Sequence, residues 1–160
     1  MNKLVHNPLT DLYAIKMSDG SVTIMNHIID ERAGIIHPIE LVMKKFKETL
    51  VDKEIVSYRK ITKDAIPVSR TFRNAWTDDF DTDTVDVCPV KARAEIRNLR
   101  NRSLEALDKK AFAEQRKPAG ALDSINTEAQ RLRDLTKHPD FNKDDIVKLE
   151  QLAKDAEHRV

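Results

Sequence analysis

Two short runs of apolar and β-branched residues open the chain and predict a β-hairpin. They are Leu12–Lys16 and Ser21–His27, and the segment Met17–Gly20 separates them. Asp19-Gly20 is typical of tight hairpin turns, because both residue types tolerate the positive φ that such turns need. Four isoleucines farther along are expected to extend this hairpin or pack beside it: Ile28, Ile29, Ile35 and Ile36.

A helical repeat and a third strand follow the hairpin. Pro38 suits the first turn of a helix, and the apolar residues from Ile39 to Phe46 fall on one helical face. The segment Glu54–Ile61 alternates as a strand does. Its alternation places Ile55, Ser57 and Arg59 on one side and Val56, Tyr58 and Lys60 on the other. Residues 1–66 are therefore predicted to form a small module of sheet plus helix.

The pattern after residue 89 is helical. Residues 90–117 contain no proline or glycine and predict one long helix, roughly 40 Å at about 1.5 Å per residue. A break at Lys117–Gly120 precedes a second helix, which starts near Leu122 and stops at His138-Pro139. Asn142 is the predicted N-cap of a third helix, with Asp144 and Asp145 complementing its positive end. Residues 90–160 are expected to be an all-α helical hairpin module, and the fold class is α+β.

Residues 67–89 are predicted to connect the two modules. Phe72 and Trp76 stand four residues apart and would share a face if this segment were helical. One interpretation is a structured joint in which the two aromatic residues seal the modules together. The other is a docking anchor that includes Arg73, since tryptophan and arginine are favoured at protein interfaces. The residues leave both interpretations open.

The chemistry-bearing residues argue against an enzyme. Asp79, Asp81 and Asp83 have a calcium-loop spacing, but an EF-hand needs glycine where Thr84 stands and glutamate where Val90 stands. A solvated acidic turn is the simpler interpretation. The five histidines lack metal-ligand spacing, and no glycine-rich or G-x-S-x-G segment occurs. Cys88, the single cysteine, is expected to be a buried or half-buried thiol. We expect no cofactor, no metal and no catalytic residue.

Charge gives a narrower set of candidates. The chain has 28 Lys and Arg against 27 Asp and Glu, a net charge of +1, which argues against nucleic acid as the main partner. Within the long helix, Arg93, Arg97 and Arg100 form a basic stripe that could hold a partner's carboxylates or phosphates. The alternative is a solvated face with internal pairs such as Arg97–Asn101. The apolar runs are too short to cross a bilayer, so a soluble protein without membrane contact is expected.

Several motifs in order resemble a family of small proteins from tailed bacteriophages. The motifs lie at residues 70–76, 85–93, 104–108 and 132–139, and they read R-T-F-R-N-A-W, V-D-V-C-P-V-K-A-R, L-E-A-L-D and L-R-D-L-T-K-H-P. The family pattern is R-x-F-R-x-A-W, then V-D-x-x-x-A-R before a long basic helix, then L-R-D-x-T-x-x-P. This chain departs from it by the inserted Cys88-Pro89, and the resemblance covers about residues 66–140.

The resemblance implies a phage protein often encoded among tail or tail-fibre genes, without an enzymatic role. We therefore expect a virion structural protein of the tail or neck region, made in the host cytoplasm. It would contact other phage structural proteins and form a homo-oligomer or ring. Its expected contact residues are Phe72, Arg73, Trp76, Arg93, Arg97 and Arg100. Two alternatives are an assembly chaperone absent from the mature particle and an early regulator that acts on a host defence or nucleic-acid enzyme.

Overall fold

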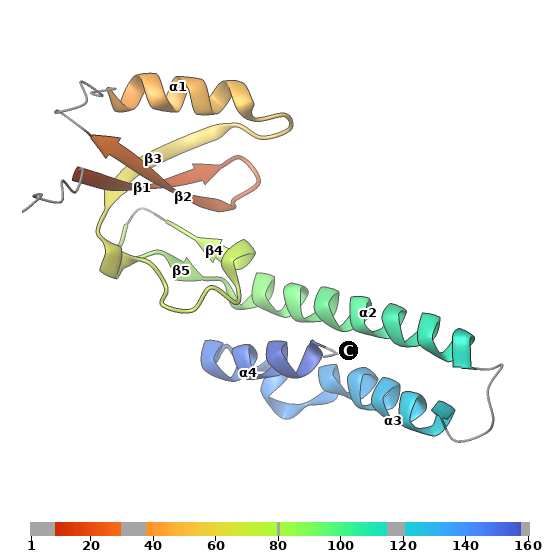
Figure 1. The fold of residues 1–160 in the computed structure, drawn as a ribbon. Coiled ribbons are helices and arrows are strands. Elements are labelled where there is room, and N and C mark those ends of the chain that lie inside the picture. Colours follow the sequence, from red (N-terminus) through yellow and green to blue (C-terminus); the bar gives the residue numbers. More distant parts are fainter. Residues whose placement is uncertain (1–8, 30–37, 80, 115–120, 158–160) are drawn as a thin grey trace, which may run out of the picture. The chain divides into compact units, whose positions relative to one another are not determined.

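A computed structural model describes residues 9–29, 38–79, 81–114 and 121–157, which form two compact units (Figure 1). Unit 1 comprises Met1–Val68 and Trp76–Asp86, and unit 2 comprises Ser69–Ala75 and Val87–Val160. Residues 67–89, expected as a separate connector, are thus divided between the two units. No helix in the described ranges is long and apolar enough to span a membrane.

Unit 1 contains an antiparallel sheet with the strand order β2-β1-β3. The strands are β1 (Leu9–Met17), β2 (Val22–Ile29) and β3 (Ile55–Ile61). The hairpin between β1 and β2 has the expected place, and its connection is the four residues from Ser18 to Ser21. Gly20 adopts φ of 71°, and its N–H donates to the carbonyl of Met17 over 2.9 Å. A glycine is needed at this position because residues with a Cβ resist positive φ.

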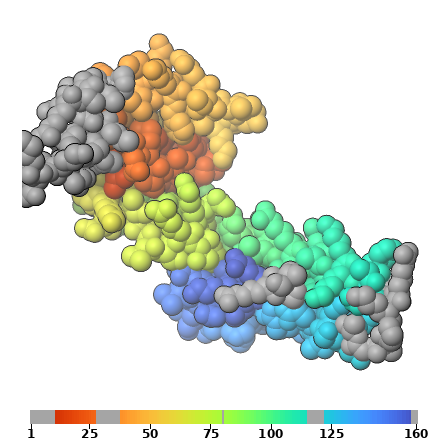
Figure 2. Space-filling model, viewed as in Figure 1, coloured from red at the N-terminus to blue at the C-terminus, as the bar shows by residue number. Residues whose placement is uncertain are grey.

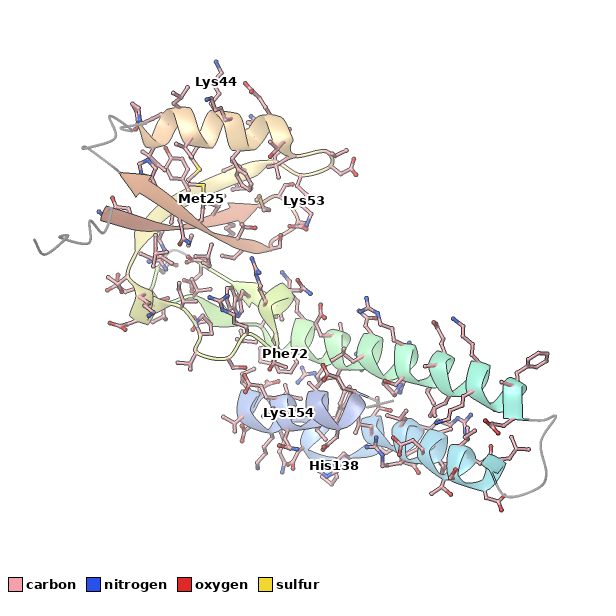
Figure 3. The ribbon with its side chains drawn as sticks, viewed as in Figure 1. Met25, Lys44, Lys53, Phe72, His138 and Lys154 are labelled. Atoms are coloured by element: carbon pink, nitrogen blue, oxygen red, sulfur yellow. The ribbon has the colours of Figure 1, made fainter. Side chains whose placement is uncertain are left out.

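Helix α1 (Ile39–Thr49) covers one face of this sheet and follows Pro38, as the sequence predicts (Figure 1). Met43 of the helix packs against Ile15 and Met17 of β1, with partly buried apolar side chains around them. One of these is Met25, which lies on the sheet face beneath α1 in Figure 3. Ile35 and Ile36 lie outside the described residues, whereas Ile28 and Ile29 end β2.

The pairing of β3 with β1 contains a bulge. Lys16 pairs with Ser57 but Met17 pairs with Ile55, so Val56 is an extra residue without a partner on β1. The bulge places Ile55 on the face covered by α1, where it joins the apolar cluster. The simple alternation expected from the sequence, with Ile55 on the side of Ser57 and Arg59, is therefore wrong at this end of the strand.

Unit 2 is helical. Its long helix α2 (Pro89–Glu114) starts with the proline at its first position, and α3 (Ala121–Asp134) and α4 (Ile146–Ala156) lie along it (Figures 1 and 2). Two 3-10 helices, Leu135–Lys137 and Pro139–Asn142, connect α3 with α4. The fold class is α+β, as predicted.

Two apolar clusters hold the helices of unit 2 together. Near its start, α2 contributes Ala92 and Ile96 to a cluster with α4 and the connecting segment, including Phe141 and Leu149. Farther along, Leu107 packs against α3. The first part of α2 thus packs against α4, and a later part packs against α3.

The predicted start of the last helix is wrong by three residues. Asn142 belongs to the second 3-10 helix, because the buried side chain of Phe141 holds that turn in the core. The N-cap of α4 is Asp145, whose Oδ1 accepts from the N–H of Lys148 over 3.2 Å. The preceding turn begins at His138, whose Nδ1 accepts from the N–H of Asp140 over 3.2 Å.

Candidate functional site

The basic stripe of α2 turns toward other elements of unit 2. Arg93 donates from Nη1 to Asp144 Oδ1 over 2.7 Å and to the carbonyl of Lys143 over 3.5 Å. Arg100 donates from Nη1 to the hydroxyl of Thr136 over 3.1 Å. These two arginines therefore link α2 to the segments on either side of the second 3-10 helix.

Arg97 stands between them and makes a different contact. Its guanidinium carbon lies 5.0 Å from the centre of the Phe141 ring, a cation–π arrangement. The pair of Arg97 with Asn101, an example of the alternative interpretation, is not observed; Asn101 Oδ1 instead accepts from Arg100 at 2.9 and 3.2 Å. Within the described ranges no acceptor is bonded to the Arg97 guanidinium.

Phe72 is a core residue of unit 2. Its side chain is buried beside Ala75, Ala92 and Ile96 (Figure 3). The segment is held to α2 by its backbone, since the N–H of Cys88 donates to the carbonyl of Ala75 over 2.9 Å. Cys88 is a half-buried free thiol, as expected. Because its side chain is buried, Phe72 stabilises the fold of unit 2.

Trp76 belongs to unit 1. A 3-10 turn, Arg73–Ala75, follows Phe72, and Trp76 then begins the short strand β4 (Trp76–Thr77). The segment is thus not one helix, and the two aromatic residues belong to different units. The indole is buried, and Nε1 has no hydrogen-bond partner in the described part of the chain. β4 pairs with β5 (Asp86–Val87).

Arg73, the remaining predicted contact residue, is exposed on the 3-10 turn. Of the six predicted contact residues, Arg73 and Arg97 have accessible charged groups. Phe72 and Trp76 are buried. Arg93 and Arg100 form hydrogen bonds within unit 2. A partner that meets the folded chain would therefore reach Arg73 and Arg97 first.

The buried ion pair between Arg59 and Asp78 escaped prediction from the sequence. Arg59 donates from Nε to Asp78 Oδ2 over 3.0 Å and from Nη2 to Oδ1 over 3.1 Å, and the carboxylate is fully buried. Arg59 also donates to the carbonyl of Thr84. Local spacing in the sequence gives no sign of this pair, because the two residues lie nineteen positions apart.

The acidic residues after Asp78 form an exposed turn. Asp79 Oδ1 accepts from the N–H of Asp81 over 3.1 Å, and Asp81 and Asp83 are exposed. In the part of the chain that the structure describes, no three His, Cys, Asp or Glu side chains are grouped so as to hold a metal ion. The acidic turn thus contains a hydrogen bond from its own backbone to the Asp79 side chain.

Comparison of the chain with protein-family models, with curated proteins and with solved structures finds no match.

Proposed function

We propose that the protein is a non-enzymatic structural protein of a bacteriophage virion, in the tail or neck region, where it makes protein–protein contacts. The resemblance of the ordered motifs to small tailed-phage proteins supports the phage setting. The side chains available at the surface support a contact role, because accessible arginines and apolar groups are favoured at interfaces.

The observation that carries the contact role is the partial burial of α2. This helix has 26 residues but buries only Ala92, Ile96, Ser103 and Leu107, a single stripe. Large apolar side chains stand exposed at its two ends, Val90 at 66% and Phe112 at 69%. A long helix that buries one stripe in its own unit keeps an exposed face that another molecule can contact.

The arrangement also changes the choice of contact residues. Replacing Arg93 or Arg100 would remove bonds within unit 2 and could weaken binding through the fold alone. Arg97 and Phe112 are better positions for testing a contact with a partner, because their replacement disturbs unit 2 less. Arg97 makes a single contact, with the ring of Phe141, and Phe112 is exposed. We expect Arg97→Glu with Phe112→Asp to reduce incorporation into particles. Lys109→Glu with Ala113→Asp, which makes the same change of net charge at exposed positions of the same helix, is the matched control.

The experiment is quantitative mass spectrometry of purified particles from cells that express the wild-type or variant chain during infection. A fixed copy number per particle, lowered by the Arg97/Phe112 variant and unchanged in the control, is the expected result. Absence from particles together with abundance in infected cells would overturn the virion role. The assembly chaperone would then be the first candidate to test.

The early-regulator alternative has its own measurement. A regulator that acts on nucleic acid through the basic helix would bind duplex or single-stranded DNA, and its affinity would fall steeply with salt. We expect no such salt-dependent binding for the wild-type chain. Binding that Arg97→Glu abolishes would instead favour the regulator.

A further inference from the structure

A groove in unit 1 lies between α1 and β3. It has a volume of about 580 Å³ and lies along one helical face and the first half of the strand. The helix contributes Glu40, Met43, Lys44 and Lys47, which fall on one face at spacings of three and four. The strand contributes Ile55–Tyr58. The groove thus combines an apolar floor with a charged rim on the helix side.

The strand that forms one wall is the edge of its sheet. β3 pairs with β1 on one side, and no other described strand pairs with it on the opposite side. An open edge presents backbone N–H and C=O groups to which an extended peptide can add as a further strand. A groove beside such an edge therefore has both a main-chain template and a place for side chains.

The ladder indicates which residues direct their backbone groups outward. The N–H of Met17 donates to the carbonyl of Ser21, so the odd-numbered residues of β1 face β2. The even-numbered residues of β1 then face β3, where they oppose Ser57, Arg59 and Ile61. It follows that Tyr58 and Lys60 direct their N–H and C=O groups away from β1, toward the open edge.

Apolar side chains are exposed beside these groups. Val56, the bulge residue, is 62% exposed and Tyr58 is 38% exposed. Met43 and Ile55 form the floor between them. An apolar side chain of an added strand would cover this surface, which α1 and the rest of the sheet leave open.

The charges on the rim of the groove favour an acidic segment over a second copy of this chain. Lys44 and Lys47 line the helix side against the single acid Glu40, and Lys44 stands out from α1 toward solvent (Figure 3). A second copy added edge to edge through β3 would bring the same lysines of two α1 helices toward each other, which like charge disfavours. A segment with carboxylates beside its apolar residues complements the rim.

We propose that the groove between α1 and β3 binds an extended acidic segment of a partner protein, which adds to β3 as a fourth strand. Its backbone bonds to the outward groups of Tyr58 and Lys60. Its apolar side chains cover Met43, Ile55 and Val56, and its carboxylates approach Lys44 and Lys47. The inference rests on the groove alone and stands whether or not the protein belongs to a virion.

The first test uses a fluorescent, end-capped hexapeptide of alternating valine and aspartate, titrated with the full-length chain at low ionic strength. We expect saturable binding that is weakened roughly tenfold when lysine replaces aspartate in the peptide. Lys44→Glu with Lys47→Glu should reverse this preference. Lys109→Glu with Lys110→Glu, which changes the same charge on exposed positions of α2, should not.

The second test separates the contribution of the Tyr58 backbone N–H to binding from that of its side chain. Tyr58→Ala keeps the outward N–H and removes the ring, whereas Tyr58→Pro removes the N–H as well and is tolerated best on an edge strand. We expect Tyr58→Pro to weaken binding beyond the loss in Tyr58→Ala. The fluorescence of Trp76, buried in unit 1, reports whether each variant remains folded.

Three results would overturn the proposal. One is the absence of saturable binding of the valine–aspartate peptide to folded protein. Another is equal binding by the groove variants and the wild-type chain. The third is a dimer in sedimentation experiments that Tyr58→Pro dissociates, which would identify a second copy as the occupant. Each is independent of whether the protein is found in particles.

Discussion

At the scale of single residues, the ion pair of Arg59 with Asp78 requires charged groups to be removed from water within unit 1. The fully buried carboxylate accepts two hydrogen bonds from one guanidinium, a geometry that offsets the cost of removing both charges from water. The pair links β3 to the segment that follows β4, nineteen residues later in the chain.

We therefore expect Asp78→Ala to lower the free energy of unfolding of unit 1 by about 3 kcal/mol, because it leaves the partly buried Arg59 guanidinium without its carboxylate. Arg59→Met combined with Asp78→Leu should recover most of this loss, since an apolar pair needs no compensating charge. Urea titrations followed by Trp76 fluorescence measure both. A double variant no more stable than Asp78→Ala would contradict the desolvation argument.

The N-cap of α4 gives a second prediction at this scale. Asp145 accepts from the N–H of Lys148, so Asp145→Ala should lower the stability of unit 2 by about 1 kcal/mol. Asn142→Ala serves as the control, because the sequence alone made Asn142 the cap whereas the structure places it in the preceding 3-10 turn. Thermal denaturation followed by far-UV circular dichroism compares the two. Equal losses would argue against Asp145 as the cap.

These residues also show where prediction from sequence stops. The hairpin, α1 and the three helices of unit 2 followed from local periodicity and from turn residues, because neighbours in the chain determine those features. The bulge at Val56, the partner of Asp78 and the cap at Asp145 depend on residues distant in sequence. Both Asn142 and Asp145 are good caps, and only the burial of Phe141 decides between them.

At the scale of elements, α2 has different neighbours along its length. Leu107 belongs to a cluster with Ile125, Ala129 and Leu132 of α3. Ile96 belongs to the cluster that includes Leu149 and Leu152 of α4. The two ends of the helix therefore stabilise different partners, although one continuous hydrogen-bonded helix joins them.

This division predicts reciprocal effects of two truncations. Leu107→Ala, which costs about 2 to 5 kcal/mol where it leaves a cavity, should accelerate amide hydrogen exchange in α3 more than in α4. Ile96→Ala should do the opposite. Exchange measured by mass spectrometry at peptide resolution distinguishes them. Equal acceleration of both helices in both variants would mean that unit 2 opens only as a whole.

At the scale of the molecule, each unit is assembled from two separate stretches of chain. The sequence predicted modules at 1–66 and 90–160 with a connector between, because composition changes near residue 89. In the structure Ser69–Ala75 belongs with the helices, whereas Trp76–Asp86 belongs with the sheet. A boundary that the chain crosses more than once leaves no mark in local composition. It also explains why Phe72 and Trp76, close in sequence, belong to different units.

Ion pairs on both units give the molecule a defined response to pH. The neighbouring lysines Lys53, Lys137 and Lys143 lower the pKa values of Asp19, Asp134 and Asp140 below the ordinary value of 3.8. Since the folded state then binds protons less readily than the unfolded state, these groups stabilise the fold fully above that value. Their contribution is lost as the pH falls through their lowered pKa values.

At alkaline pH the dependence of stability on pH has the opposite sign. Asp11 raises the pKa of Lys60 above its ordinary value of 10.5, so this pair stabilises the fold below that value and is lost as the pH rises through the raised pKa. We therefore expect the melting temperature to be highest between these limits and to fall on acidification below about pH 4. Asp140→Asn should make the acid fall shallower, because it removes one of the groups that must be protonated. Asp108→Asn, at an exposed position of α2, is the control, and an acid fall of equal steepness in both variants would exclude Asp140 as a contributor.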